Sequence, residues 1–529
     1  MKYGLRWLAA ALAVSMLFTV AGCKPKDEPV NNPSQPSSQE EVTHPIDPAI
    51  QKDVDLLIAR YILPYETTLR GQAFSNVSQI PDRLLYRYAM GIVDSVFVSE
   101  DFLLTDLKGE NSYHAIPDDL ITEIIKLDFD LDGFLYNKAL YYDDSQGVYD
   151  RGNWYVIEGT TEVFAREAKL LDNGDIWILV GRRAGNHDLD SVEYVFRPQK
   201  PLDLTYVDLG SIRSDGDCNY SFVSVTPRKD MEDYSKVVEI STPQQLVELS
   251  ELVSSGDTTH GAYTYRLMGD IDMQGVEFRP IGILPQGDEE SEGASHPFQG
   301  GFDGQGYTIK NLTIDLPDHS NVGFFAHIGE HGLVKNLNLE NCVVTGGNQV
   351  GTLAGTSSGD VVQCTAEGEV KGSYEVGGLL GITYGDRLAQ VSYCQFDGNV
   401  SGTQSVGGLI GGPTCADIPR SYASGQIDVA ASEEFENGMH IGGLVGLNNC
   451  SYIDSSFASV EIETQVLTKS VGRFLGYNNY GDVTNCFYNN GVAARWPAAS
   501  TQNTGTHQLT GLSEKEFASK LEQLIYPGK

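Results

Sequence analysis

Positive charge is scarce in this chain. Its 529 residues include 36 lysines and arginines against 72 aspartates and glutamates, which gives a net charge of −36. Proteins that bind nucleic acid neutralise phosphates with a basic surface, and attraction to anionic lipid headgroups also needs clustered cations. The composition therefore excludes a general nucleic-acid binder and an electrostatic grip on an anionic bilayer.

Cysteine and long hydrophobic runs are scarce as well. Eight cysteines in 529 residues are too few for a disulfide scaffold. The most apolar run, residues 7–20, is shorter than the roughly 20 residues of a typical membrane-spanning helix. Hydrophobic residues still make up 41% of the chain, which is enough for buried cores, and the length favours about two to four domains.

Residues 1–22 have the pattern of a secretory signal peptide. Lys2 and Arg6 precede the apolar run, which ends in Val20-Ala21-Gly22-Cys23. This ending resembles the bacterial lipobox, in which the cysteine thiol receives diacylglycerol and becomes the mature N-terminus. The resemblance implies that acyl chains on Cys23 anchor the protein to the outer side of a membrane, at the cell surface. The alternative is an ordinary signal peptide followed by an unmodified cysteine.

Residues 23–44 are predicted to be a disordered tether, because Pro, Ser, Asn and Gln dominate them. Residues 45–233 are predicted to form an α+β domain. Asp47-Pro48 and Pro117 predict helix starts, since both precede apolar residues at helical spacing. Farther along, Asn173-Gly174 lies between two apolar runs and predicts a hairpin with a type I′ turn. Further strands are expected at 191–198, 204–210 and 220–227.

One motif in this domain has the residue types of a calcium loop. Asp128, Asp130 and Asp132 alternate along the chain and Gly133 follows them, as in the opening of an EF-hand loop, where carboxylates converge on one cation. The twelfth position, which normally supplies a bidentate carboxylate, is Ala139. Two interpretations stay open, a calcium site and an acidic turn with solvated charges.

The C-terminal half contains an internal repeat. A six-residue signature, best represented by Val-Gly-Gly-Leu-Leu-Gly, recurs at spacings of 28, 26, 30, 35 and 30 residues. Its second residue is always glycine, at Gly323, Gly351, Gly377, Gly407, Gly442 and Gly472. Periods of this length are typical of stacked arrays, and consecutive glycines disfavour helices. Residues 234–490 are therefore predicted to form a parallel β-solenoid with inward aliphatic residues and glycines at positive-φ corners or close backbone contacts.

The repeat resembles the GLUG-motif family, most closely at 376–381, 406–411 and 441–446. Residues 302–314 and 269–282 resemble the coils that commonly precede such repeats. Related repeats occur in bacterial surface proteins, including the non-catalytic region of some immunoglobulin-A-cleaving metallopeptidases. The resemblance implies a right-handed β-helix at the cell surface and implies no reaction.

Helices are expected to cap both ends of the stack. Thr242-Pro243-Gln244-Gln245 and Ser513-Glu514-Lys515-Glu516 are capping-box patterns that lead into amphipathic segments. Residues 491–529 are predicted to be a C-terminal cap that contains the second helix. Such caps would cover the open strand edges of the terminal coils.

The histidine and cysteine patterns of the C-terminal half do not indicate a metal or catalytic site. His327 to His331 fits the H-x-x-E-H zinc pattern, but that motif needs a helix, and His327 takes a signature slot filled by glycine in the other copies. Cys364, Cys394 and Cys486 align with Ser421 and Ser456, which predicts a ladder of small side chains. The pattern shows no role for Cys218, Cys342, Cys415 and Cys450.

Three functions follow as hypotheses. The first is a lipid-anchored surface protein whose solenoid is an adhesive or binding stalk for a protein or glycan. The second is a carbohydrate-active β-helix enzyme, which would need Asp, Arg or Lys recurring at one offset. No such column is evident, although Asp270, Asp272 and Asp303 cluster near the first coil, where they are expected to cap turns. The third is a calcium-dependent module that uses Asp128, Asp130 and Asp132.

Overall fold

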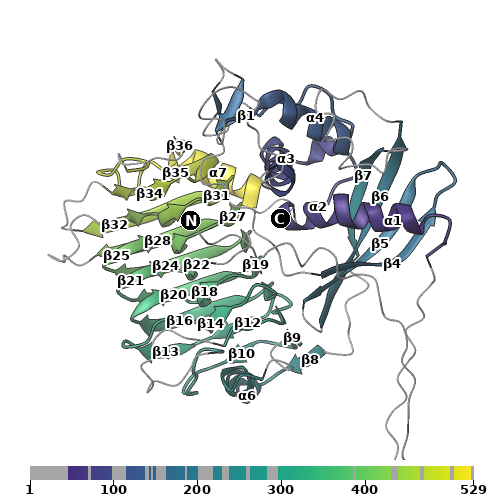
Figure 1. Cartoon of the computed structure of the whole chain (residues 1–529). Helices are drawn as coiled ribbons and strands as arrows, with labels where there is room; N and C mark the ends of the chain where they lie inside the picture. The colour runs from purple at the N-terminus through teal and green to yellow at the C-terminus, as the bar shows by residue number, and fades with distance from the viewer. Residues whose placement is uncertain are drawn as a thin grey trace, which may run out of the picture. The chain divides into compact units, whose positions relative to one another are not determined.

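The computed structural model of the chain is shown in Figure 1. His44–Lys529 forms one compact unit. The structure describes residues 46–69, 73–97, 115–136, 142–143, 147–150, 162–184, 187–200, 219–228, 237–257, 263–282, 296–384, 389–429, 439–464, 470–500 and 506–525. The expected signal peptide, tether and Cys23, and the strand expected at 204–210, lie outside these residues and stay predictions.

The N-terminal region packs helices against a four-stranded antiparallel sheet. The sheet has the order β4-β5-β6-β7 and consists of β4 (Glu162–Leu170), β5 (Ile176–Ala184), β6 (His187–Gln199) and β7 (Asn219–Arg228). The helices are α1 (Gln51–Leu57), the π-helix η1 (Ile58–Ile62), α2 (Leu63–Thr68), the 3₁₀-helix η2 (Val77–Gln79), α3 (Asp82–Phe97) and α4 (Asp118–Phe129). A small sheet contains β1 (Ala115–Pro117), β2 (Tyr142–Asp143) and β3 (Val148–Asp150).

Two local predictions here need correction. The first helix begins at Gln51, because Asp47 and Pro48 instead form a turn in which the Asp47 carboxylate accepts the Ala49 amide at 2.8 Å. The predicted hairpin exists, but its turn is not type I′: positive φ occurs at Gly174 (86°) and not at Asn173. Leu171 bonds to Asp175 across the turn at 2.8 Å, so three residues form the loop and glycine takes the left-handed position of a G1 bulge.

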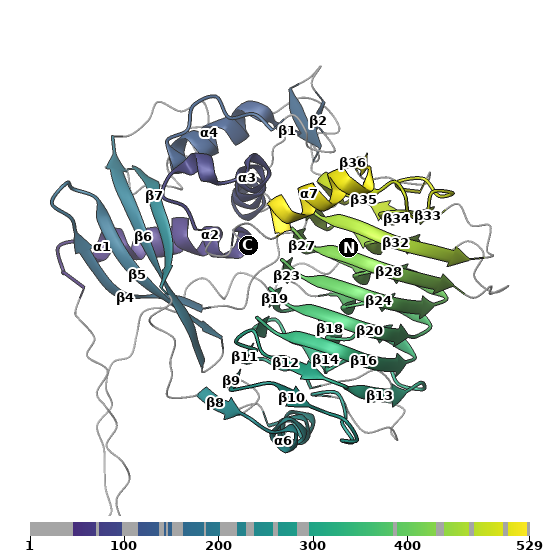
Figure 2. The ribbon, with the colours of Figure 1, turned by 180° about the vertical axis from the view of Figure 1, so that it is seen from behind.

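Residues 237–488 form a β-solenoid of about seven turns. Figure 2 shows its strands stacked as successive rungs. The first ladder begins at β8 (Val237–Ile240) and continues through β9 (Thr264–Leu267), β11 (Gly301–Asp303), β15 (Leu333–Lys335), β19 (Asp360–Val362), β23 (Ala389–Ser392), β27 (Ala416–Pro419), β31 (Tyr452–Asp454) and β35 (Asp482–Asn489).

The second ladder contains the longest strands of the solenoid. It consists of β10 (Ile271–Asp272), β12 (Thr308–Lys310), β13 (Thr313–Leu316), β16 (Asn338–Gly346), β20 (Thr365–Lys371), β24 (Gln395–Gly402), β28 (Tyr422–Val429) and β32 (Phe457–Thr464), and it is closed by β35 and β36 (Thr506–Leu512). Every strand pair in it is parallel.

Two further ladders are built from the repeat signature. One contains β14 (Phe325–Ile328), β18 (Ala354–Ser357), β22 (Leu380–Thr383), β26 (Ile410–Pro413), β30 (Val445–Asn449) and β34 (Leu475–Asn479). The other contains β17 (Asn348–Val350), β21 (Tyr374–Gly377), β25 (Gln404–Gly407), β29 (Ile441–Gly442) and β33 (Val471–Gly472). The parallel solenoid predicted from the repeat is confirmed.

The second glycine of each signature permits close backbone approach. A Cβ on Gly407 would lie 2.0 Å from the Ile410 carbonyl oxygen, and one on Gly442 would lie 1.9 Å from that of Val445. None of the six signature glycines has positive φ. Left-handed corners are instead occupied mainly by non-glycine residues, such as Glu375, Ser405 and Cys450. The expected use of these glycines at positive-φ corners is therefore wrong for the signature positions.

The two terminal helices cover different parts of the solenoid. Helix α6 (Pro243–Ser254) has the predicted capping box, and its buried residues Leu246, Leu249 and Val253 belong to the solenoid core. Helix α7 (Glu514–Ile525) lies at the other end of the stack (Figure 2). Its Phe517 meets Phe457 edge-to-face at 5.5 Å, on the outward side of β32. The last coil of the core is covered by other residues, including Val492, Trp496 and Leu509.

Candidate functional site

The last coils present a column of polar side chains on the outward face of the first ladder. Strand register places Gln390 beside Asp417, Asp417 beside Tyr452, and Tyr452 beside Asp482. Each step moves one coil along the stack, about 4.8 Å. A carboxylate therefore lies on each side of Tyr452, and both meet side chains from the N-terminal region.

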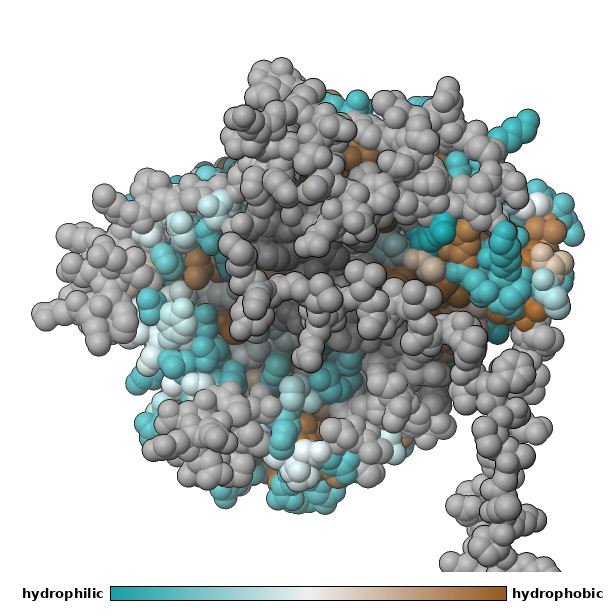
Figure 3. Space-filling view, in the orientation of Figure 1, coloured by the Kyte–Doolittle hydropathy of each residue, from teal (hydrophilic) through white to brown (hydrophobic). Residues whose placement is uncertain are grey.

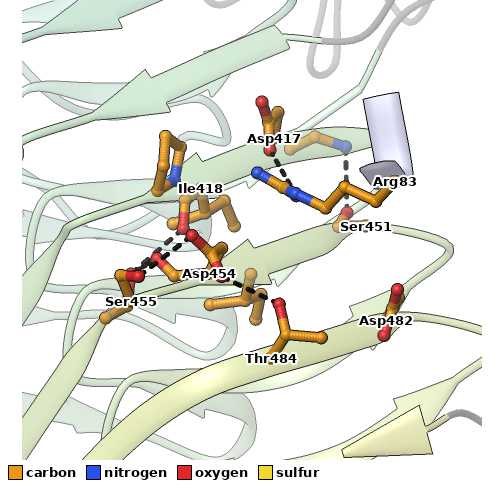
Figure 4. Close-up of polar contacts among 12 residues, drawn as sticks. Arg83, Asp417, Ile418, Ser451, Asp454, Ser455, Asp482 and Thr484 are labelled. Atoms are coloured by element: carbon orange, nitrogen blue, oxygen red, sulfur yellow. Dashed lines mark hydrogen bonds and ion pairs between the residues drawn. The ribbon is translucent and has the colours of Figure 1, made fainter. Parts of the chain in front are cut away.

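Arg83 on α3 provides the first of these contacts. Its Nη1 donates to Asp417 Oδ1 at 3.2 Å, and the two side chains are 12% and 16% exposed. Figure 4 shows the guanidinium directed toward Asp417, with Asp454 and Asp482 on the following strands. Burial by itself lowers the pKa of Arg83, but Asp417, Asp454 and Asp482 more than compensate, so the pKa is raised. The field of three carboxylates thus stabilises the buried cation.

Arg87 lies one turn farther along α3 and is 5% exposed. Its Cζ is 5.7 Å from the centre of the Tyr452 ring, which is the geometry of a cation–π contact. Burial lowers the pKa of Arg87, Tyr452 and Asp417 oppose this effect, and the like charge of Arg83 adds to it. The carboxylates and the Tyr452 ring therefore offset part of the cost of burying the two guanidinium cations.

Tyr136 contacts the other end of the column. Its hydroxyl donates to Asp482 Oδ2 at 3.2 Å, and the residue is 7% exposed. Burial raises the pKa of Tyr136, and the Asp482 carboxylate raises it further. The Tyr136 ring packs at 5.4 Å against Tyr86, which lies between the two arginines on α3. The contact thus joins α3, residue 136 and three coils.

Asp454 supports this contact from the neighbouring outward position of β31. Its Oδ1 accepts hydrogen bonds from Thr484 Oγ1 at 2.9 Å and Asn485 Nδ2 at 3.2 Å, and its Oδ2 accepts one from Ser455 Oγ at 3.0 Å. These bonds hold the carboxylate in place on successive coils. In chemical terms these are docking contacts within one chain, because the carboxylates face cations and hydroxyls of the N-terminal region. We call Asp417, Tyr452 and Asp482 the docking column.

The three aspartates of the predicted calcium loop have different surroundings in the structure. Asp128 is fully buried and its Oδ2 accepts the Tyr88 hydroxyl at 2.7 Å, whereas Asp130 ends α4 with a left-handed φ of 53°. Asp132 is exposed and pairs with Lys126 at 2.7 Å, which raises the pKa of that lysine. Among the described residues, no group of three or more His, Cys, Asp or Glu side chains is arranged to hold a metal ion. Calcium binding stays a prediction.

The aligned cysteines and serines form one buried column. Each donates to a backbone carbonyl of the preceding coil: Ser421 to Val391 at 3.1 Å, Ser456 to Ile418 at 3.0 Å and Cys394 to Val361 at 3.4 Å. Cys364 and Cys486 make the same bond at 3.6 Å. Cysteine and serine interchange because both are small donors.

Other residues noted in the sequence have structural roles in the first coils. Asp270 accepts the Thr308 amide at 2.9 Å, Asp272 that of Gln274 at 3.0 Å and Asp303 that of Gln305 at 2.9 Å. His327 lies on β14 opposite Thr356, one position past the predicted glycine slot, and its Nε2 is 3.0 Å from Ser358 Oγ. Ala326 takes that slot instead, because the first coil reaches its strand one residue earlier than the next coil does.

The docking residues were not identified from the sequence, although a signal was present. Asp417, Tyr452 and Asp482 are separated by 35 and 30 residues, the same offsets that separate the signature at 406, 441 and 471. Arg83 and Arg87 are four residues apart in an otherwise apolar segment, so they share a helix face. Aligning every residue at the repeat offsets would have found the column but not its partner.

Parts of this chain are similar to two known proteins, and the chain spans only a small share of the length of each. The chain is 37% identical over 152 residues to halomucin of Haloquadratum walsbyi, covering 27% of this chain and 2% of halomucin. It is 32% identical over 109 residues to a Gly-rich membrane protein of Evansella cellulosilytica, covering 20% of this chain and 12% of that protein. No family model matches the chain.

The names of these relatives are compatible with a surface or membrane-associated protein. None of the helices in the described part of the chain has both the length and the hydrophobicity needed to cross a bilayer.

Proposed function

We propose that this protein is a lipid-anchored surface protein whose solenoid is a binding stalk for a protein or glycan. The observation that carries the proposal is the outward face of the second ladder. Its strands stack in register, so that Glu367, Asp397 and Ser424 form one column and Glu369, Asn399 and Gln426 form another. Such a face is regular, because each outward position repeats on successive coils.

The chemistry of this face favours recognition by polar contacts. Outward residues alternate with buried ones along β20 and β24. Figure 3 shows mainly hydrophilic side chains among the described residues over the solenoid strands on the side in view. The acidic residues on the outward face of β20 to β32 are Glu367, Glu369, Asp397, Asp428, Glu461 and Glu463. Lys371 lies on the same face. A partner with cationic or hydroxyl groups fits this face better than a polyanion.

The proposal includes a lipid anchor on Cys23, which would hold the stalk outside a membrane. Replacing Cys23 with alanine should release the protein from the membrane fraction into the medium. Protein that stays in the membrane fraction to the same extent as the parent would remove the lipid anchor from the proposal while leaving the binding face untouched.

Binding is tested with detergent-solubilised full-length protein on arrays of glycans and surface proteins. The variant Glu367→Gln/Glu369→Gln should weaken capture of any ligand found, because it removes two charges from the centre of the face. The variant Glu248→Gln/Glu251→Gln is the matched control, since it removes two exposed charges from α6. Equal capture by both variants would overturn the assignment to this face. Cleavage of an arrayed glycan would favour the carbohydrate-active enzyme instead.

A further inference from the structure

Cys415 and Cys450 occupy the same corner of successive coils. Thr414 is bridged to Asn449, and Asp417 is paired with Tyr452. The offset is 35 residues on both sides, so Cys415 and Cys450 are in register. The Cys415 amide also donates to the Asn449 carbonyl at 3.0 Å. The two cysteines are therefore direct neighbours along the stack.

The backbone at this corner suits a bond between the two sulfurs. Both residues have left-handed φ values, 49° for Cys415 and 56° for Cys450, so their side chains leave equivalent corners in the same direction. Neighbouring parallel strands are about 4.8 Å apart. Disulfide-linked cysteines usually have Cα atoms roughly 4.4–6.8 Å apart, and the corner spacing falls within that range. Their Cβ atoms are usually about 3.5–4.5 Å apart, so the two parallel side chains, which are free thiols in this structure, have to move closer together when the bond forms.

Accessibility separates this pair from the other described cysteines. Cys342, Cys364, Cys394 and Cys486 are buried, whereas Cys415 and Cys450 are partly exposed. Burial raises the pKa of Cys450 to about 11, and the neighbouring Cys415 adds to the effect. Burial also raises the pKa of Cys415, but Arg87 opposes it. The Arg87 guanidinium is thus a cation that acts on Cys415, where it favours the thiolate form.

We propose that Cys415 and Cys450 form an inter-coil disulfide by exchange with an external disulfide. The Cys415 thiolate attacks one sulfur of that disulfide and releases a thiol, which leaves a mixed disulfide on Cys415. Cys450 then loses its proton and attacks the Cys415 sulfur, which releases a second thiol. Two electrons and two protons pass to the external disulfide, and one bond joins the two coils.

The bond would fix the corner that leads into the docking column. Tyr452, on which Arg87 packs, lies two residues after Cys450, and Asp417 lies two residues after Cys415. An oxidised pair would hold these two strands in register beside α3. This inference goes beyond the proposed function and does not depend on the lipid anchor or on any ligand.

The test uses full-length protein treated with oxidised glutathione, acid-quenched, denatured, alkylated and digested for mass spectrometry. The expected result is one cross-linked peptide pair that joins Cys415 to Cys450, with the four buried cysteines alkylated. Alkylation of both corner cysteines would overturn the proposal. A glutathione on each of them, or a link from either to Cys218, would overturn it too.

Two variants sharpen this test. With Cys450→Ser, Cys415 should stop at the mixed disulfide with glutathione, because the resolving thiol is missing. Cys364→Ser is the matched control, since serine occupies the equivalent position in two other coils, and the 415–450 link should still form. Loss of the link in Cys364→Ser would contradict the proposed pairing. Ligand capture by protein that lacks the link would leave the proposed function intact.

Discussion

The solenoid and the N-terminal region bury their cores in different ways. The solenoid core is mostly aliphatic and lies between repeated strands, so each inward position is stacked on its equivalent in the next coil. The N-terminal core is gathered around aromatic rings. Phe222 lies 4.7 Å from Phe196, 4.9 Å from Tyr65 and 5.2 Å from Phe129.

The difference concerns how far a local change spreads. In a stacked array each coil contacts only its neighbours, so stability is roughly a sum of local terms. In the N-terminal region, Phe222 touches rings from α2, α4 and β6, so one truncation loosens several elements at once. Among the described residues, the docking column joins the two regions directly, so a change in one region can reach the other through it.

The largest loss of stability is expected at a glycine where two backbone segments are in contact. Gly407→Val would place Cβ 2.0 Å from the Ile410 carbonyl oxygen, which no side-chain movement relieves. We expect a loss of about 4 kcal/mol or more in the free energy of unfolding, with faster hydrogen exchange in the coils around β25 and continued protection in β4 to β6.

The control for this prediction is Gly412→Ala in β26. There the nearest heavy atom would be 3.5 Å away, on the flexible side chain of Glu375, so the change in stability should stay within about 1 kcal/mol. Similar losses for the two glycine variants would contradict the role given to backbone contact.

The next effect is expected in the aromatic core. Phe222→Ala should lower the free energy of unfolding by about 3–5 kcal/mol, with exchange rising across the whole N-terminal sheet. Val400→Ala, at a buried position of β24, should cost about 2 kcal/mol and affect neighbouring coils alone. If Phe222→Ala affected β7 alone, the contrast between the two regions would fail.

A smaller effect is expected from pH. Burial lowers the pKa of His327 to about 4, although Glu330 opposes the shift. The imidazole has a pKa of about 6.5 in the unfolded chain, so the neutral ring contributes stability that is complete above that pH. This contribution, on the order of 2–3 kcal/mol, is lost as pH falls from about 6.5 to about 4.

Urea unfolding at pH 7 and pH 4.5 measures this loss. His327→Thr copies Thr356, the partner in the next coil, and should show the smaller loss because it lacks the titrating ring. Equal losses in the parent and the variant would contradict the assignment to His327.

The smallest effect is expected at the contact between the regions. A double-mutant cycle on Arg83→Ala and Asp417→Ala should give a coupling of about 1–2 kcal/mol, because the pair is mostly buried. The exposed pair of Lys126 and Asp132 is the control and should show no measurable coupling. Equal coupling energies in the two cycles would mean that burial does not strengthen the ion pair between Arg83 and Asp417.

Much of the fold could be predicted because the sequence repeats a local pattern. Six signatures at similar spacing indicated the stack, and the aligned cysteines and serines indicated one buried ladder. Turn details were harder to predict. Positive φ falls on residues such as Glu375 and Ser405, which carry no strong local preference for it, because the coil geometry enforces that conformation.

The candidate site could be predicted only in part. Asp417, Tyr452 and Asp482 keep the repeat offsets, so their stacking was encoded in the sequence. Arg83 is 334 residues away from Asp417, and Tyr136 is 346 residues away from Asp482. No local pattern connects positions so far apart.

The sequence by itself determined the stacking, because a glycine-rich aliphatic repeat can bury its residues only against its own copies. The same repeat offsets stack Asp417 on Tyr452 and place Cys415 beside Cys450. The tertiary structure alone decided which residues of the N-terminal region meet this column. Arg83, Arg87 and Tyr136 contact it through burial and proximity that arise only when distant segments pack, because a distance in space between such segments is not specified by any local pattern of residues.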